Sequence, residues 1–488
     1  MRGTYLWLAA AMMTASLAYA QQATITRLDG SKISALEIDG TMTRLMSAAE
    51  VTGAGIAVFN HGKIAYMKAY GFRDKAKNLP LTEDSVMSAA SLSKVAFTYA
   101  VLQLADEGRL DLDKPVYQYL AKPLPEYPNY VDLANDPRYQ RITARMLLSH
   151  TGGFANWRWF EDDRKLRIHF EPGSRYAYSG EGISLLQLVV ETITKTPLEE
   201  LMQQRVFQPL GMSRTSMVWQ ERFEGDYANG YDEYGRSLGP LKWHKAGAAG
   251  SMVTTLADFS RFMQAVLDGR LLRPKTREQM ISPQIQIVSK HMFPTLSEET
   301  SDENKAIRLS SGLGWSLYWT PYGEAFSKGG HDDGWRHYTI CFDKPKTGIV
   351  IMTNSGNGEG IFEYLQEALL KNTFAPIAWE NYTPYDKLPP RPPLEQHKQV
   401  EVNGKILDRY VGRYGLPPNI VLTVRREGDH LSVQENDEPK QDLMPESETD
   451  FFSTVSSDTY TFEINSEGKV ITMILHADGK DIPIKRIE

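Results

Sequence analysis

Cysteine is almost absent from this sequence, since Cys341 is the only one among 488 residues. A single cysteine cannot form an internal disulfide, a zinc ribbon or a Cys–Cys redox pair. We therefore expect packing alone to stabilise the fold. Cys341 itself lies in a strand-like pattern and is expected to be a small buried side chain.

An excess of positive charge is also missing. The sequence has 54 Lys and Arg residues against 61 Asp and Glu residues, a net charge of −7, and no stretch stands out as basic. Nucleic-acid-binding proteins concentrate positive charge on one face. We expect no nucleic-acid partner, and the composition leaves the oligomeric state open, a homo-oligomer included.

Long hydrophobic runs are missing except at the N-terminus. Arg2 precedes an apolar run from Tyr5 to Leu17, and Ala18-Tyr19-Ala20 fits a small-x-small cleavage site. The run is shorter than the roughly 20 residues that span a bilayer. These features predict a signal peptide over residues 1–20 and an exported protein, periplasmic or secreted, without a stable membrane anchor. An uncleaved anchor or a buried helix is the alternative.

The rest of the chain has the composition of a globular protein, with 41% hydrophobic and 24% charged residues. Apolar runs on both sides of a short turn predict β-hairpins at 55–67 and 335–353. Helical patterns fill much of the sequence between these hairpins, at 91–108, 182–193, 198–206 and 258–267, and another follows at 359–370. We therefore predict an α+β domain over 21–383, with an antiparallel sheet built from both chain ends, flanking helices and an all-helical region.

The C-terminal part has a different texture. Residues 384–404 are rich in proline and predict an extended linker. Residues 405–488 contain short alternating runs separated by turn residues about every 8–12 positions. This spacing is typical of a small all-β barrel or sandwich, and we predict a separate small β-barrel domain there.

Chemistry is first suggested by Ser91-Leu92-Ser93-Lys94, which opens an apolar helical pattern. Residues i and i+3 share a helix face, so the Ser91 hydroxyl and the Lys94 amine can meet. A serine becomes a nucleophile when a base takes its proton, and a buried lysine with a lowered pKa can act as that base. The pattern alone is weak, because a capping serine followed by a solvated lysine has the same spacing.

Further segments follow the Ser-x-x-Lys pattern in a fixed order. They are 147–153 (LLSHTGG), 172–179 (PGSRYAYS), 207–212 (FQPLGM), 248–251 (AAGS) and 312–315 (GLGW). With Ser-x-x-Lys, they resemble the serine β-lactamase and penicillin-binding-protein family, closest to its class C β-lactamase-like, esterase and D-peptidase branch. The resemblance covers about residues 35–375. Residues 405–488 resemble the lipocalin-like barrels appended to some members.

The resemblance implies a second catalytic element at Tyr178-Ser179-Gly180, matching the family's Tyr-x-Asn. Tyr178 would share the base role with Lys94 and relay the proton to the leaving group. Gly180 departs from the pattern because glycine has no side-chain amide to bind Lys94 or a substrate carbonyl. Glu181 is a candidate for that function, and Gly180 and Glu181 are both expected to line the substrate site.

The third element has two candidates. Lys346-Thr347-Gly348 matches the family's Lys-Thr-Gly but falls in the turn of the last hairpin. Lys328-Gly329-Gly330 lies on the preceding strand, where the family places this element, and we prefer it. Lys328 would lower the Lys94 pKa, Gly329 and Gly330 would contact substrate without the usual hydroxyl, and the backbone N–H groups of Ser91 and His331 would form the oxyanion hole.

Other residues carry weaker signals. Trp157, Trp159 and Phe160 lie in a loop that we expect to line the pocket. The adjacent residues His331 to Asp333 cannot converge on one ion without distant ligands, so we expect no metal. No cofactor is implied either.

These observations predict an exported serine hydrolase that forms an acyl-enzyme on Ser91. A peptidase or esterase acting on a small-molecule or short peptide substrate, of small acyl or D-amino-acid type, fits them best. Loss of the polar side chains at Gly180 and Gly329 weakens the case for a β-lactamase, which stays an alternative. A non-catalytic binding or sensor protein on the same fold is the other alternative.

Overall fold

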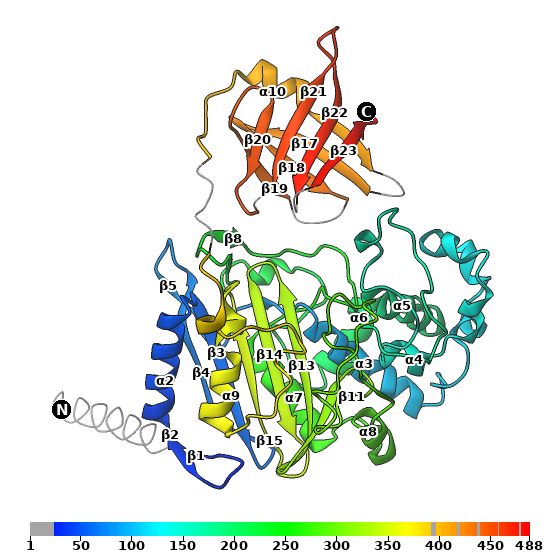
Figure 1. The fold of residues 1–488 in the computed structure, drawn as a ribbon, viewed down its shortest axis with the longest axis vertical. Helices are drawn as coiled ribbons and strands as arrows, with labels where there is room; N and C mark the ends of the chain where they lie inside the picture. Colours follow the sequence, from blue (N-terminus) through cyan, green and yellow to red (C-terminus); the bar gives the residue numbers. More distant parts are fainter. Residues whose placement is uncertain (1–23, 392–396, 417–419, 437–439, 457, 478–479) are drawn as a thin grey trace, which may run out of the picture.

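The computed structural model describes residues 24–391, 397–416, 420–436, 440–456, 458–477 and 480–488. The signal peptide expected at residues 1–20 and residues 392–396 of the expected linker lie outside the described residues. Figure 1 shows a large domain of sheet and helices, joined through the 384–404 segment to a small barrel. In the described part of the chain, no helix is both long and apolar enough to cross a membrane.

The large domain is organised around a nine-stranded antiparallel sheet in the order β10-β11-β12-β13-β14-β15-β3-β4-β5. Strands from near the N-terminus thus pair with strands from residues 285–353. The strands are β3 (Gly53–Asn60), β4 (Lys63–Asp74), β5 (Leu79–Pro80), β10 (Ile285–Gln286), β11 (Ser310–Ser311), β12 (Ser316–Thr320), β13 (Gly323–Asp332), β14 (Trp335–Phe342) and β15 (Thr347–Thr353).

Both faces of the sheet are covered, which explains why its central strands read as continuous apolar runs. Along β15, Ile349 and Ile351 face the core that contains α2 (Ala35–Ala48) and α9 (Phe362–Leu370). Val350 and Met352 alternate with them and face the opposite core. That core contains α3 (Leu92–Asp106) and α7 (Leu256–Asp268).

A mainly helical region lies between β5 and β10 and continues the α3 core (Figure 1). Short 3₁₀ turns and small two-stranded sheets connect its helices. The helices are α4 (Ala144–Leu148), α5 (Gly180–Thr194), α6 (Leu198–Met202) and α8 (Pro274–Met280). The two-stranded sheets of this region are β6 (Met87–Ser88) with β9 (Val253–Thr254) and β7 (Gly230–Tyr231) with β8 (Ser237–Gly239). A third, β1 (Thr24–Thr26) with β2 (Lys32–Ser34), lies before α2.

The C-terminal part is a closed eight-stranded barrel, because β16 pairs with both β17 and β23. Helix α10 (Gly404–Tyr410) contributes Leu407 and Tyr410 to the barrel core. The strands are β16 (Gly412–Leu416), β17 (Ile420–Glu427), β18 (His430–Glu435), β19 (Gln441–Pro445), β20 (Asp450–Ser453), β21 (Thr459–Ile464), β22 (Val470–Ala477) and β23 (Lys480–Arg486).

The predicted fold class is confirmed: an antiparallel sheet flanked by helices, a helical region and a small β-barrel. Both predicted hairpins are present, as β3–β4 and β14–β15. Cys341 is fully buried in β14. The sequence predicted no helix between the linker and the barrel strands, because the seven residues of α10 are too few for a clear helical pattern.

One buried hydroxyl ties helix α3 to the segment that enters β9. Ser93 Oγ donates to Ala90 O at 2.6 Å and accepts a hydrogen bond from the Met252 backbone N–H at 3.0 Å. Ser93→Ala leaves the Met252 N–H without this partner, so we expect it to cost about 1–3 kcal/mol of stability. Denaturant unfolding measures this cost. Ser282→Ala, near the surface, is the control and should be nearly neutral; equal stability of the two variants would contradict the prediction.

Candidate active site

Ser91 lies immediately before the first residue of α3, at a sharply turned point of the chain. Ala90 before it has a φ of +46°, in the left-handed region that residues with a side chain rarely adopt. Although Ser91 occupies the capping position, its side chain makes no capping hydrogen bond. The Ser91 hydroxyl is therefore not engaged in holding the helix end.

Lys94 follows one turn later and is only 1% exposed. Its Nζ lies 3.1 Å from Ser91 Oγ and 2.6 Å from the carbonyl oxygen of Ala249, to which it donates. Burial lowers the Lys94 pKa, and nearby Lys328 lowers it further, whereas Tyr178 opposes the shift. A buried amine with a lowered pKa next to a serine hydroxyl is suited to accept the serine proton.

Tyr178 comes from the start of α5. The next residue, Ser179, caps this helix by accepting a hydrogen bond from the Gly182 N–H at 2.9 Å, and donates its own hydroxyl to Ala155 O at 2.7 Å. Lys328 on β13 donates to the Tyr178 hydroxyl at 2.9 Å. Three elements that are distant in sequence thus bring Tyr178 to the two lysines.

The charges around Tyr178 decide its protonation. Burial alone would raise the Tyr178 pKa, but the Lys328 and Lys94 ammonium groups, with hydrogen bonds from Lys328 and Ser91, lower it to about 7. The two Nζ atoms lie 4.2 Å and 5.0 Å from the centre of the Tyr178 ring. A phenolate, which can act as a base, is therefore accessible near neutral pH.

His150 packs against Tyr178. The two rings lie 4.4 Å apart, and His150 Nδ1 accepts a hydrogen bond from the Ser179 N–H at 3.2 Å. Burial, together with the positive charges of Lys328 and Lys94, lowers the His150 pKa well below its ordinary value. A neutral His150 adds no third positive charge to the site.

The oxyanion hole is expected to consist of the backbone N–H groups of Ser91 and His331. Within the described residues, the backbone N–H of Ser91 has no hydrogen-bond acceptor. His331 is on β13, and its side chain is exposed, 3.8 Å from Glu359. A Cβ on neighbouring Gly330 would lie 3.0 Å from Ala89 O, so glycine there lets β13 pass close to the residues before Ser91.

Gly180 lies against Trp157, in the loop that also contains Trp159 and Phe160. A Cβ at this position would lie 2.4 Å from Trp157, so the indole fills the space of a side chain at 180. Trp157 stacks on Trp159 with ring centres 4.6 Å apart, and Lys94 Nζ lies 5.7 Å from the Trp157 ring. The loop residue Trp157 thus forms part of the wall beside Lys94. Trp159 and Phe160 are 50% and 68% exposed.

Glu181, which is expected to line the substrate site, forms a buried ion pair with Arg158. Its two oxygens accept hydrogen bonds from Arg158, Nε at 2.8 Å and Nη2 at 2.7 Å, and the Arg158 backbone N–H adds a third at 3.0 Å. Glu181 is 5% exposed. Its carboxylate therefore holds the loop that carries Trp157.

Two residues beyond the family motifs were missed, because no local signal marks them. Glu380 and Tyr382 follow α9 and pack on the face of β13 that Gly329 occupies. Ser327 Oγ donates to Glu380 Oε1 at 3.4 Å. Burial raises the Glu380 pKa to about 8, although Lys328 opposes the shift.

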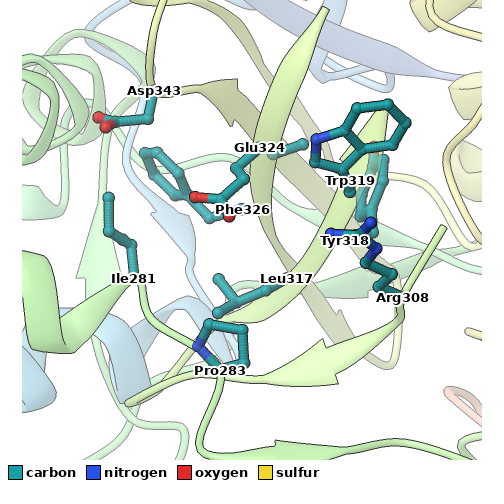
Figure 2. A pocket seen from close by; sticks show the side chains of 10 residues that line it. Ile281, Pro283, Arg308, Leu317, Tyr318, Trp319, Glu324, Phe326 and Asp343 are labelled. Carbon is teal, nitrogen blue, oxygen red and sulfur yellow. The ribbon is translucent and has the colours of Figure 1, made fainter. Parts of the chain in front are cut away.

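Lys346 lies apart from the site. It is in the turn between β14 and β15 with a φ of +48°, and its Nζ lies 3.5 Å from Asp268. A hollow at the beginning of β12 and β13 is also separate (Figure 2). Apolar side chains such as Leu317 and Phe326 line much of it, and none of Ser91, Lys94, Tyr178 and Lys328 does.

Similarity to a known family extends over most of the chain. Residues 38–371 match the Beta-lactamase family. This chain belongs to that family. Residues 396–486 match a second family, described as a domain of unknown function (DUF3471).

Similar proteins include a penicillin-binding protein and an esterase. A penicillin-binding protein of Bacillus subtilis (strain 168) is 26% identical over 464 residues, 86% of this chain and 92% of that protein. Esterase EstB of Burkholderia gladioli is 31% identical over 234 residues, 42% of this chain and 57% of that protein. The structure of an octameric penicillin-binding protein homologue from Pyrococcus abyssi matches with a TM-score of 0.56 at 20% identity, over 92% of this chain and 98% of that one, and shows the shared fold.

Restoring the family's asparagine at position 180 should harm this protein. The Cβ of Gly180→Asn would collide with the Trp157 ring, which cannot rotate away without leaving its stack on Trp159. We expect a loss of about 1–3 kcal/mol in stability, measured by thermal or denaturant unfolding. Gly180→Asn combined with Trp157→Ala relieves the collision and should cost less than the sum of the two single changes. A fully stable Gly180→Asn single variant would contradict this account.

Proposed function

We propose that the protein is a serine hydrolase that forms an acyl-enzyme on Ser91. The observation that carries the proposal is the pair of contacts from Lys94 Nζ to Ser91 Oγ (3.1 Å) and from Lys328 Nζ to the Tyr178 hydroxyl (2.9 Å), in which Lys94, Tyr178 and Lys328 are buried and Ser91 is half-buried. A solvated surface lysine beside a capping serine would not produce this arrangement.

The proposed reaction has two stages. The Ser91 proton passes to the Lys94/Tyr178 base pair as Oγ attacks the substrate carbonyl carbon. The backbone N–H groups of Ser91 and His331, at the N-terminus of α3 and on β13, stabilise the oxyanion. Tyr178 then gives a proton to the departing alcohol or amine. A water molecule, deprotonated by the same base, attacks the ester carbon and releases the acid and Ser91.

We further propose esters or peptides with a small acyl or D-amino-acid group as substrates, and export after cleavage near Ala20. The esterase relative supports the ester, and Trp157 in the space beside Gly180 supports a site without the amide contact at that position. Lys328 supplies positive charge next to Tyr178.

Ser91→Ala should abolish the reaction. Removing Oγ leaves no atom to form the acyl-enzyme, so we expect hydrolysis of a p-nitrophenyl ester to fall by about 10⁴-fold or more. Labelling by a fluorophosphonate probe should disappear, while Ser282→Ala keeps both signals. Undiminished labelling of Ser91→Ala would refute the assignment. A folded wild type with neither labelling nor turnover would support the non-catalytic binder instead.

The pH profile should report on Tyr178. Because its phenolate is the basic form and its pKa is lowered to about 7, kcat/KM should rise with pH and level off above roughly pH 7. Lys328→Leu removes a cation that stabilises the phenolate, so the midpoint should move to higher pH. Lys346→Leu, in the surface turn, is the matched control and should leave the midpoint unchanged. A flat profile from pH 5 to 9 would contradict this base pair.

A further inference from the structure

Tyr382 is held rigidly above β13 by aromatic neighbours. Its ring packs edge-on against Phe362 and Tyr338, with ring centres 5.4 Å and 6.0 Å apart. Its backbone N–H donates to Ile377 O at 3.1 Å. Only 9% of the residue is exposed. The position of its hydroxyl is therefore set by the fold.

That hydroxyl occupies the place of a side chain at position 329. A Cβ on Gly329 would lie 2.0 Å from the Tyr382 hydroxyl oxygen. The backbone of Gly329 is not in the left-handed region, so space rather than conformation excludes other residues there. Position 329 has glycine instead of a residue with a hydroxyl. The Tyr382 hydroxyl, from a residue 53 positions later, occupies the space of that side chain.

The strand beside this hydroxyl has an unpaired edge. β12 pairs with β13 only as far as Ser327, so from Lys328 onward one edge of β13 is unpaired. Among the described residues, the Tyr382 hydroxyl has no hydrogen-bond partner. Burial and the neighbouring Glu380 and Glu359 carboxylates raise the Tyr382 pKa well above its ordinary value, which keeps the hydroxyl a neutral donor.

We propose that Tyr382 is a substrate-binding residue whose hydroxyl donates a hydrogen bond to a second oxygen of the acyl substrate, beyond the scissile carbonyl, at the free edge of β13. The acceptor is a carboxylate or an amide carbonyl oxygen, since both offer the same lone pairs to a phenol. This inference rests on the proposed reaction at Ser91 and names a specificity determinant for it.

The alternative is that Tyr382 only fills space. Tyr382→Phe separates the two roles, because it keeps the ring and its packing and removes the hydroxyl alone. A hydrogen bond from a neutral donor is worth about 0.5–1.5 kcal/mol, and one to a charged group more, so its loss corresponds to a change of about threefold to thirtyfold or more. Tyr364→Phe is the matched control. It removes a hydroxyl near the surface that donates to Asp386, which lies in the same segment as Tyr382.

The experiment compares three p-nitrophenyl esters with different acyl groups. Butyrate has no second oxygen, N-acetylglycine carries an amide carbonyl, and glutarate carries a free carboxylate. We expect Tyr382→Phe to raise KM about tenfold for one of the last two esters and to leave butyrate hydrolysis and the pH midpoint unchanged. A loss on glutarate identifies a carboxylate as the acceptor, and a loss on N-acetylglycine identifies a carbonyl.

Two results would overturn the inference while leaving the proposed function intact. They are equal kinetics of Tyr382→Phe and wild type on all three esters, and an equal loss on all three, which would mark a packing effect. No turnover and no labelling of Ser91 in the wild type would instead overturn the proposed function and this inference together.

A second variant tests the shared position directly. Gly329→Ser alone collides with the Tyr382 hydroxyl and should lower kcat/KM on all three esters. In the Tyr382→Phe background the 2.0 Å contact is removed and the nearest ring carbon lies 3.2 Å from the new Cβ, so a small shift of the ring admits the serine. The new serine hydroxyl should then recover at least half of the lost affinity for the sensitive ester. If the losses in kcat/KM of the two single variants simply add in the double variant, the serine hydroxyl does not replace the Tyr382 hydroxyl, and the inference is contradicted.

Discussion

Two buried ammonium groups placed around one phenol are the constraint on which the rest of this structure depends. Lys94 and Lys328 are 1% and 6% exposed, and both lie over the Tyr178 ring. Two like charges away from water are unfavourable unless a negative charge lies between them. A Tyr178 phenolate supplies that negative charge. The lowered pKa of Tyr178 and the burial of the two lysines therefore depend on each other.

The fold keeps these three groups in place by using elements from different parts of the chain. Helix α3 carries Lys94, the start of α5 carries Tyr178, and β13 carries Lys328. Contacts between the elements are made by small or neutral groups, such as the Ser93 hydroxyl and the close approach at Gly330. None of these supports brings a further charge next to the lysines.

The edges of the site differ from the family pattern in a consistent way. At positions 180 and 329 a polar side chain is replaced by glycine, and in both places an aromatic residue from elsewhere fills the space. Trp157 is held there by the Arg158–Glu181 pair, whereas Tyr382 is held by ring packing. An amide contact is lost at the first position, and a hydroxyl is regained at the second. The chemical character of the pocket is therefore decided by residues outside the motifs.

The sequence predicted much of the fold and the main candidates of the site. Apolar runs around turns predicted the β3–β4 and β14–β15 hairpins, and a strand has a clear signal when both of its faces are buried. The order of the motifs favoured Lys328 over Lys346, and the two residues do lie in very different surroundings. By contrast, nothing near Glu181 in sequence indicates that Arg158 would bind both of its oxygens.

By itself, then, the sequence determined the fold class, the family and the candidates for the reactive groups, because these depend on local periodicity and on short motifs. Only the tertiary structure decided the protonation of Tyr178 and the shape of the pocket. A pKa depends on the distance to charges such as Lys328, 150 positions from Tyr178. The space at a glycine likewise depends on which distant side chain packs against it, and no local pattern records that contact.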